Sequence, residues 1–170
     1  MIARIYAKGA RVLCYFTAMI ARVYARFAKD FSEKDFKFCK QKYYYMTENE
    51  LSKIVFDCAL KVHQVLGPGL LESAYEECLF YELKKIGLNV QKQKALPLIY
   101  EEVKLDIGYR IDIIIENKLI LEIKSVEALN DIHFAQLLTY LKLTDCKLGM
   151  LINFNVTLIK NGIRRVVNNL

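Results

Sequence analysis

Hydrophobic residues in the chain recur first with the period of a helix and later with the period of a strand. In residues 51–66 the apolar positions fall three and four residues apart, and Gly67-Pro68-Gly69 ends the run. Thr47 and Glu50 precede it with the spacing of a helix capping box. Similar spacing predicts a second helix over residues 70–86.

The rest of the chain is predicted to be mostly strand. Residues 88–103 contain short strand-like stretches, with Pro97 favouring an edge position. Residues 105–115 and 119–125, separated by a turn at 116–118, predict an antiparallel hairpin. Residues 131–143 predict a helix, residues 147–154 a buried strand, and Asn161-Gly162 a hairpin turn before a last strand. This order, α-α-β-β-β-β-α-β-β, predicts an α/β fold with a mixed sheet flanked by helices.

The charge of the chain is confined to one end. The 170 residues are 54% apolar and 26% charged, which suits one ordinary globular domain, and the net charge is +6. Residues 1–45 carry 10 Lys and Arg against 3 Asp and Glu, a balance of +7, whereas residues 46–170 carry 15 against 16, a balance of −1. The chain therefore divides into a basic segment, residues 1–45, and a near-neutral body, residues 46–170.

The basic segment has the pattern of an amphipathic helical extension. On a helix its cations lie within about 40° of one line, opposite an apolar face; they are Arg4, Lys8, Arg11, Arg22, Arg26 and Lys29. Such a helix suits contact of residues 1–29 with a membrane surface, a targeting role, or docking on a partner or on the body. Met46 also reads as a natural start, so residues 1–45 are alternatively a non-native or dispensable extension.

The cysteines and the hydropathy of the chain indicate its cellular compartment. The chain has five cysteines, an odd number with no C-x-x-C pair, which argues against a disulfide framework, a zinc finger or an iron–sulfur site. Cysteines that act as small core hydrophobes suit a reducing compartment, so a cytoplasmic location is expected. There is no run of 18 uncharged apolar residues, so no membrane span is expected.

The candidate chemistry lies on the predicted hairpin. Glu122 and Lys124 share one face of their strand, and the hairpin turn brings Asp112 of the preceding strand near Glu122. Two carboxylates at this spacing suit a hard divalent cation, beside which Lys124 orients or helps deprotonate water and stabilises charge on a phosphate. The alternative is a buried ion-pair network without catalysis.

Two predicted helices carry further polar residues. His133, Gln136 and Tyr140 share one face of the third helix, where they either approach the carboxylates or serve as ordinary core and rim residues. On the second helix, Glu72 and Tyr75 share a face. The helix dipole alone accounts for an acid such as Glu72 in a first turn. His63 is expected to pack or cap against the Gly67-Pro68-Gly69 turn.

The body resembles the GxxExxY protein family over residues 50–170. The name motif is present as Gly69-Leu70-Leu71-Glu72-Ser73-Ala74-Tyr75. The resemblance continues through Gly108-Tyr109-Arg110-Ile111-Asp112, Leu121-Glu122-Ile123-Lys124, the segment from His133 to Leu141, and Gly149-Met150-Leu151-Ile152-Asn153-Phe154. That family is similar to a compact branch of the PD-(D/E)xK nuclease-like superfamily with a RecB-like motif arrangement, which implies a restriction-endonuclease-like fold.

The resemblance implies a role for each motif residue. Asp112 and Glu122 become ligands of Mg²⁺ or Mn²⁺, with the Ile123 carbonyl as a third ligand and Glu72 assisting from its helix. Lys124 becomes the partner that orients water. Gln136 and Tyr140, joined by Tyr75 and His133, form the expected substrate-binding set. The expected function is a metal-dependent nuclease acting on DNA or RNA, and the alternative is a non-catalytic nuclease-like module for binding or regulation.

Overall fold

The computed structural model describes residues 46–170, and of residues 98–100 and 103–108 it describes the backbone only. These residues fall in one structural unit, residues 40–170. The predictions for the basic segment concern residues 1–45, which lie outside the described residues. Within the part that is described, no helix is long and apolar enough to cross a membrane.

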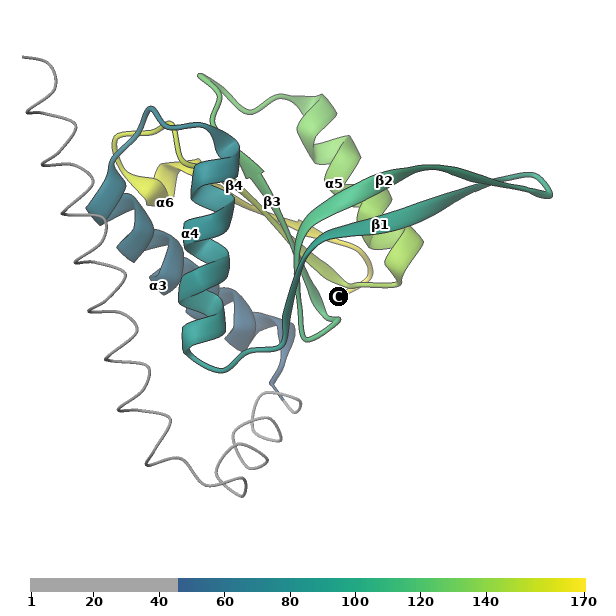
Figure 1. The fold of residues 1–170 in the computed structure, drawn as a ribbon, viewed down its shortest axis with the longest axis horizontal. Helices are drawn as coiled ribbons and strands as arrows, with labels where there is room; N and C mark the ends of the chain where they lie inside the picture. The colour runs from purple at the N-terminus through teal and green to yellow at the C-terminus, as the bar shows by residue number, and fades with distance from the viewer. Residues whose placement is uncertain (1–45) are drawn as a thin grey trace, which may run out of the picture. The chain divides into compact units, whose positions relative to one another are not determined.

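The described chain alternates helices with one sheet (Figure 1). In chain order the elements are α3 (Glu48–Leu66), α4 (Glu72–Lys85), β1 (Val90–Tyr100), β2 (Val103–Ile115), β3 (Leu119–Lys124), α5 (Asp131–Thr144), β4 (Leu148–Asn153), α6 (Ile159–Gly162) and β5 (Ile163–Val167).

The predicted start and end of α3 are confirmed. The Thr47 hydroxyl accepts the Glu50 N–H at 3.3 Å, and the Glu50 carboxylate accepts the Thr47 N–H at 2.8 Å, which completes the capping box. At the other end Gly67 adopts φ +66° and its N–H bonds the His63 carbonyl at 2.8 Å. A glycine is needed there because other residues rarely adopt positive φ.

The sheet has the order β1-β2-β3-β4-β5, and all neighbours are antiparallel except the parallel pair β3 and β4. The mixed sheet and the β2–β3 hairpin are therefore confirmed. Within residues 88–103, however, the structure has one long strand, β1 over Val90–Tyr100, rather than several short ones, and Val103 already begins β2. Pro97 is tolerated because β1 is an edge strand whose register shifts between Leu96 and Leu98. β1 and β2 extend together well beyond the other strands (Figure 1).

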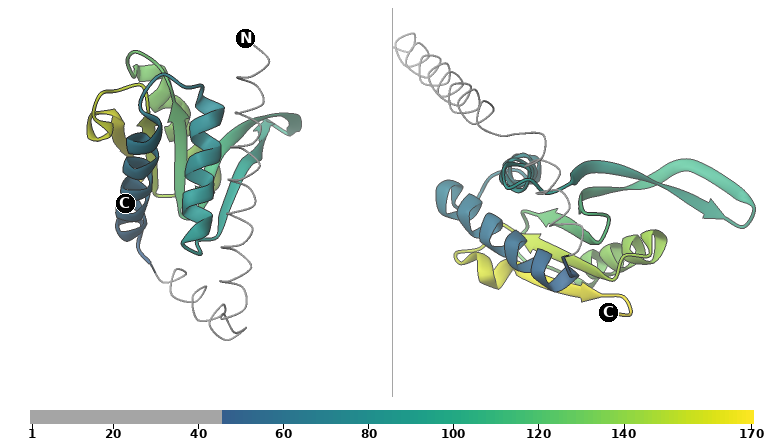
Figure 2. Two further views of the ribbon diagram at one scale, coloured as in Figure 1. Left: turned by 60° about the vertical axis from the view of Figure 1, so that its left-hand side comes forward. Right: turned by 90° about the horizontal axis from the view of Figure 1, so that it is seen from below.

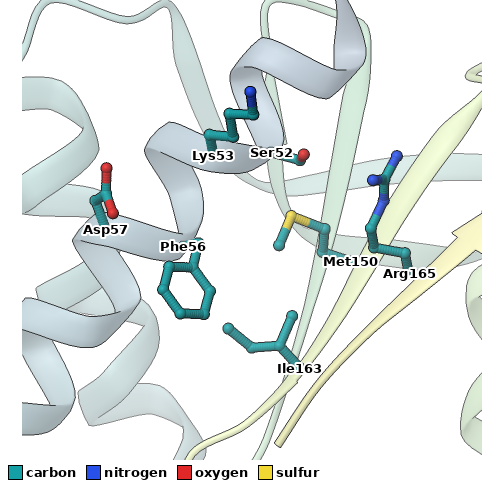
Figure 3. Close-up of a pocket in the computed structure, with 7 residues that line it drawn as sticks. All are labelled: Ser52, Lys53, Phe56, Asp57, Met150, Ile163 and Arg165. Atoms are coloured by element: carbon teal, nitrogen blue, oxygen red, sulfur yellow. The ribbon is translucent and has the colours of Figure 1, made fainter. Parts of the chain in front are cut away.

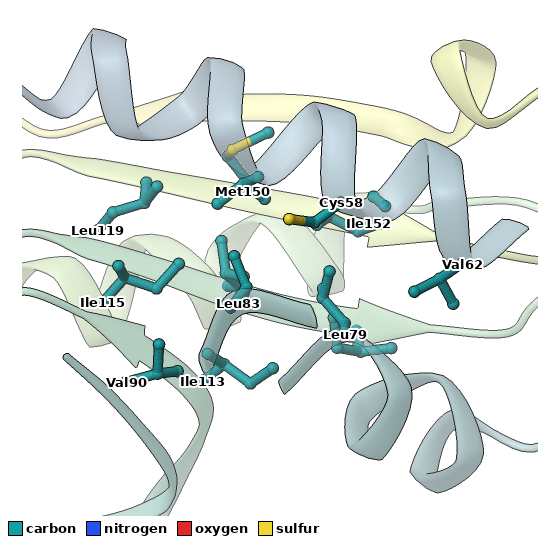
Figure 4. Close-up of a cluster of buried hydrophobic side chains, with 14 of the residues drawn as sticks. Cys58, Val62, Leu79, Leu83, Val90, Ile113, Ile115, Leu119, Met150 and Ile152 are labelled. Atoms are coloured by element: carbon teal, nitrogen blue, oxygen red, sulfur yellow. The ribbon is translucent and has the colours of Figure 1, made fainter. Parts of the chain in front are cut away.

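Helices cover both faces of the sheet, and each face has its own apolar core. On one face α3 and α4 pack over Ile113, Ile115 and Leu119 (Figure 4), and Leu121 and Ile123 belong to the same cluster. On the other face Leu137 and other residues of α5 pack over β2, β3 and β4. Figure 2 shows the same arrangement from two further directions. Strands buried on both faces explain why β3 reads as a nearly continuous apolar run with Glu122 as its one acid.

The connection from β4 to β5 differs from the predicted tight hairpin. Asn161 and Gly162 close the short helix α6 and do not form a two-residue turn. A Cβ on Gly162 would stand 2.1 Å from the Asn153 carbonyl oxygen, so this position accepts only glycine without a backbone shift. The glycine that suggested a turn is thus required for close packing of α6 against the end of β4.

Candidate functional site

Asp112 lies where β2 and β3 separate. Their ladder consists of three pairs, from Ile115 opposite Leu119 to Ile113 opposite Leu121. At the next position the Asp112 carboxylate accepts the Ile123 N–H at 2.9 Å, so a side chain takes the place of a backbone partner. Burial raises the pKa of Asp112, and the negative charge of Glu72 raises it further. The hydrogen bond from Ile123 and the positive charge of Lys124 lower this pKa, but by less.

Glu122 is the most deeply buried acid of the site, with 1% of its surface exposed. Its Oε1 accepts from the Lys124 ammonium at 2.6 Å, whereas Oε2 is buried and has no hydrogen-bond partner. Burial, with the nearby charge of Asp112, raises the pKa of Glu122 to about 7. An unpartnered buried carboxylate oxygen is costly and calls for a ligand.

Lys124 supplies positive charge to this acidic site. Its side chain is 13% exposed and pairs with Glu122. Burial lowers the pKa of Lys124, but the hydrogen bond to Glu122 and the charges of Glu122, Glu72 and Asp112 outweigh it, so the pKa of Lys124 is raised. The ammonium therefore stays protonated near neutral pH and acts as a fixed cation.

Glu72 of α4 lies next to the end of β3, close enough for its charge to act on the site. It is the first residue of α4, and its Oε1 accepts the Ser125 N–H at 3.0 Å. The Ser125 hydroxyl in turn donates to the Leu70 carbonyl at 2.6 Å. These two bonds fasten the start of α4 to the end of β3, and the charge of Glu72 acts on Asp112, Glu122 and Lys124.

Residues of α5 approach the carboxylates from the second face of the sheet. The Gln136 amide donates to the Tyr140 hydroxyl at 2.7 Å, so the predicted pair is brought together. Burial raises the pKa of Tyr140, and the hydrogen bond from Gln136 lowers it. The charges of Glu122 and Asp112 also raise this pKa, so the phenol lies within electrostatic range of the site. His133 is half-buried, and its Nδ1 accepts the Asn130 N–H at 3.3 Å in the capping box of α5.

Tyr75 has a different environment from the one expected of a substrate-binding residue. It is fully buried, and its ring stacks on Phe154 with 4.4 Å between centroids. Its hydroxyl donates to the Gly67 carbonyl at 2.7 Å and accepts the Leu70 N–H at 3.0 Å. The side chain thus holds the α3–α4 turn together and has no surface left for a ligand.

His63 packs in the same region, as expected, but through a different bond. It is buried, its Nε2 lies 2.7 Å from the Val156 carbonyl, and its ring stacks near Phe154. The Gly67 turn is bonded by the His63 backbone rather than by its imidazole.

We predict that Tyr75→Phe lowers the free energy of unfolding by about 1–2 kcal/mol, because two turn hydrogen bonds are lost while the ring stack is kept. Urea unfolding followed by circular dichroism measures this, with Tyr81→Phe as a control because Tyr81 is 39% exposed. Affinity for nucleic acid should stay within about threefold. A large loss of affinity without loss of stability would instead assign Tyr75 to ligand binding.

Two buried polar groups near the site had no predicted role. Asn153, 2% exposed, accepts the Val126 N–H at 3.1 Å and donates to the Val126 carbonyl at 2.8 Å, so it fixes the loop that follows Lys124. Glu76 on α4 is also buried and accepts from the Gln93 amide at 2.7 Å. Two features of the sequence point to these residues. Asn153 is a polar residue at the end of an apolar strand, and Glu76 is an acid one helical turn after Glu72.

The site fits a hard cation held partly by water. Within residues 46–170 no three His, Cys, Asp or Glu side chains are grouped so as to hold a metal ion together. Asp112 and Glu122 nevertheless supply two carboxylates, and the unpartnered Glu122 Oε2 is an available ligand atom. Mg²⁺ commonly binds through one or two carboxylates and keeps several waters, so the donor set is suitable for it.

A separate pocket of about 390 Å³ contains none of these residues (Figure 3). It lies between α3 and the β4–β5 edge of the sheet, and its lining residues are Ser52, Lys53, Phe56, Asp57, Met150, Ile163 and Arg165. The carboxylate site and this pocket are therefore in different places.

Comparison with known proteins agrees with this geometry. A family model described as the PD-(D/E)XK nuclease superfamily matches residues 49–166, from the first turn of α3 into β5. The chain belongs to the PD-(D/E)XK nuclease superfamily. Its mixed five-stranded sheet with flanking helices is consistent with the restriction-endonuclease-like fold of that superfamily. No curated protein and no solved structure matches the chain.

Membership in the PD-(D/E)XK superfamily indicates nuclease activity in general, and such nucleases generally use divalent metal ions. The sequence predicts that the motif of the superfamily falls on Asp112 and on Glu122-Ile123-Lys124, with Ile111 where the name motif has proline. These are the residues that meet where β2 and β3 part.

Proposed function

We propose that this PD-(D/E)XK protein is a metal-dependent nuclease that hydrolyses phosphodiester bonds of DNA or RNA. The observation that supports it most is the buried Glu122 carboxylate, which has one oxygen on Lys124 and the other without a partner. A purely structural ion pair gains stability only when its remaining lone pairs are satisfied. The free oxygen beside Asp112 instead suits a cation.

Each residue of the proposed site has a separate role in metal binding or catalysis. Asp112 and Glu122 hold Mg²⁺ or Mn²⁺, with the Ile123 carbonyl as a third ligand and Glu72 assisting from α4. The cation supplies Lewis-acid stabilisation of phosphate charge and ionisation of water near neutral pH. Lys124 stays protonated, orients the attacking water and stabilises the charge that develops on the phosphate.

Residues of α5 contact the substrate. Gln136 and Tyr140 form a hydrogen-bonded pair within electrostatic range of the carboxylates and position a phosphate or sugar oxygen. His133 has its Nδ1 engaged in the helix cap, which leaves Nε2 for a ligand. Tyr75 is left out of this set because it is fully buried.

Two finer assignments accompany this proposal. The Gly69-Leu70-Leu71-Glu72-Ser73-Ala74-Tyr75 motif supports membership of the GxxExxY family within the superfamily. A cytoplasmic location is supported by the three described cysteines, Cys58, Cys78 and Cys146, which are all free thiols.

The test is cleavage by the purified full chain. We expect loss of labelled single- or double-stranded DNA or RNA with 5 mM Mg²⁺ or Mn²⁺ (about the usual assay level) and none with EDTA. Isothermal titration calorimetry should detect binding of the same ions to the full chain. Intact substrate under all of these conditions would contradict the proposal.

A second candidate, a non-catalytic binding or regulatory module, is favoured by one observation. Lys124 pairs with the buried Glu122 at 2.6 Å, as in an ion-pair network that serves structure alone. This candidate predicts nucleic-acid binding without cleavage and no calorimetric signal with millimolar Mg²⁺ or Mn²⁺. The two proposals therefore give opposite results in the same experiment.

A further inference from the structure

An exposed aromatic ring stands at the edge of the proposed site. Tyr109 of β2 is 43% exposed, and its ring centroid lies 5.6 Å from that of Tyr140, tilted by 60°. Tyr140 is buried and carries the hydrogen bond from Gln136. The outer ring of this pair is thus supported on one side by the site and open to solvent on the other.

The body has no excess of positive charge for binding a duplex through its phosphates. Its net charge is −1, and the cations among the main influences on the pKa of Asp112 are Lys124, already paired with Glu122, and Arg110. A protein that holds a duplex through 6–10 phosphate contacts needs about that many cations. At the site itself, we therefore expect contacts with the bases to contribute much of the affinity for a polynucleotide.

Two exposed apolar residues lie next in sequence to residues of the proposed site. Leu71, directly before Glu72, is 78% exposed, and Ile132, directly before His133, is 75% exposed. Exposed apolar side chains are able to pack on base faces, which are open in a single strand but covered by stacking in a duplex. Leu71 and Ile132 come from the starts of α4 and α5, which carry the acid and the polar residues of the site.

From this arrangement we propose that the site accepts a single-stranded polynucleotide, with one unpaired base stacked on the exposed ring of Tyr109 and Arg110 on an adjoining phosphate. The inference rests on the proposed function for the position of the scissile phosphate. The stacking itself is independent of metal and of cleavage. DNA and RNA present the same base faces, so both are included.

The chain contains no tryptophan, which permits a direct test. Tyr109→Trp introduces a single indole whose emission reports stacking at that position. In the full chain with EDTA, we expect strong quenching by 20-nucleotide single strands of DNA or RNA (about a standard probe length) and little by the matching duplex. Tyr81→Trp is the matched control, because Tyr81 is a similarly exposed tyrosine on α4, and its emission should not change.

Affinity measurements complete the test. By fluorescence anisotropy in EDTA, Tyr109→Ala should weaken binding of single strands by about 5- to 100-fold, whereas Tyr81→Ala should not weaken it. Tyr109→Phe keeps the aromatic ring and should restore binding; it also separates loss of stacking from loss of folding. Equal affinity for duplex and single strand, or unchanged binding by a folded Tyr109→Ala, would overturn the inference.

The two proposals fail separately. Suppose that the natural protein cleaves duplexes as well as single strands, and that substitutions at Tyr109 change neither emission nor affinity. The proposed nuclease function is then supported and the single-strand inference is wrong. If single strands bind through Tyr109 but no metal supports cleavage, the single-strand inference stands and the nuclease is wrong. Comparison of the DNA and RNA arms then gives the sugar preference.

Discussion

Glu122→Gln should abolish metal-dependent cleavage, with a fall in kcat/KM on the order of 10³-fold or more. Glutamine has nearly the shape of glutamate, and its amide oxygen still accepts from Lys124. It removes the negative charge at the buried oxygen that has no partner in the structure. The loss is therefore specific to cation binding rather than to packing. A cleavage assay with a labelled oligonucleotide measures it.

Glu127→Gln serves as the matched control for this experiment. Glu127 is an exposed acid in the loop after β3, close in sequence but outside the carboxylate cluster. Its substitution makes the same change in net charge, so general electrostatics is held equal. Full activity in Glu122→Gln would show that the buried carboxylate has no role in catalysis and would favour the non-catalytic module. Titration calorimetry should also show that Glu122→Gln has lost the Mg²⁺ or Mn²⁺ signal.

The central part of the site was predictable because strand geometry is regular. A hairpin with its turn at residues 116–118 places position 112 beside position 122, and alternation places Glu122 and Lys124 on one face. The hydrophobic pattern does not predict that the alternation of faces along β2 is interrupted at Asp112. Ile111 and Ile114 both belong to the α5 core, three residues apart, so strict alternation fails between them. This interruption coincides with the bond from the Ile123 N–H to the Asp112 side chain and with the positive φ of Gln93 on β1, neither of which the periodicity predicts.

Other features depended on tertiary context. Tyr75 sits on the same helix face as Glu72, yet a stacked Phe154 from the other end of the body buries it. The edge position of Pro97 was predicted and is confirmed, but the register shift between Leu96 and Leu98 was not predicted. The role of Asn153 depends on a loop 27 residues away in sequence. For Tyr75 and Asn153, spacing along the sequence predicts the helix or strand that carries the residue. It does not predict the distant contact that determines what the side chain does.

In the metal-free protein, the same Glu122→Gln substitution should raise the free energy of unfolding at pH 8 by up to about 3 kcal/mol. The pKa of Glu122 is raised from its ordinary value of 4.5 to about 7, chiefly by burial. Between these two values the folded state retains a proton that the unfolded state has lost. Stability of the natural protein therefore falls as the pH rises from about 4.5 to 7 and keeps this penalty above pH 7.

Glutamine resembles the protonated acid, so the variant lacks this fall. Urea unfolding in EDTA, followed by circular dichroism from pH 4.5 to 8.5, should show similar stabilities at the acid end and a difference that widens up to about pH 7. Millimolar Mg²⁺ should then stabilise the natural protein at pH 8 but not the variant, because only the natural site binds the ion. A variant that is less stable than the natural protein at pH 8 would mean that the Glu122–Lys124 pair is net stabilising, as a structural ion pair requires. Higher stability together with lost cleavage would instead show that this buried carboxylate is retained for its chemistry at a cost to the fold.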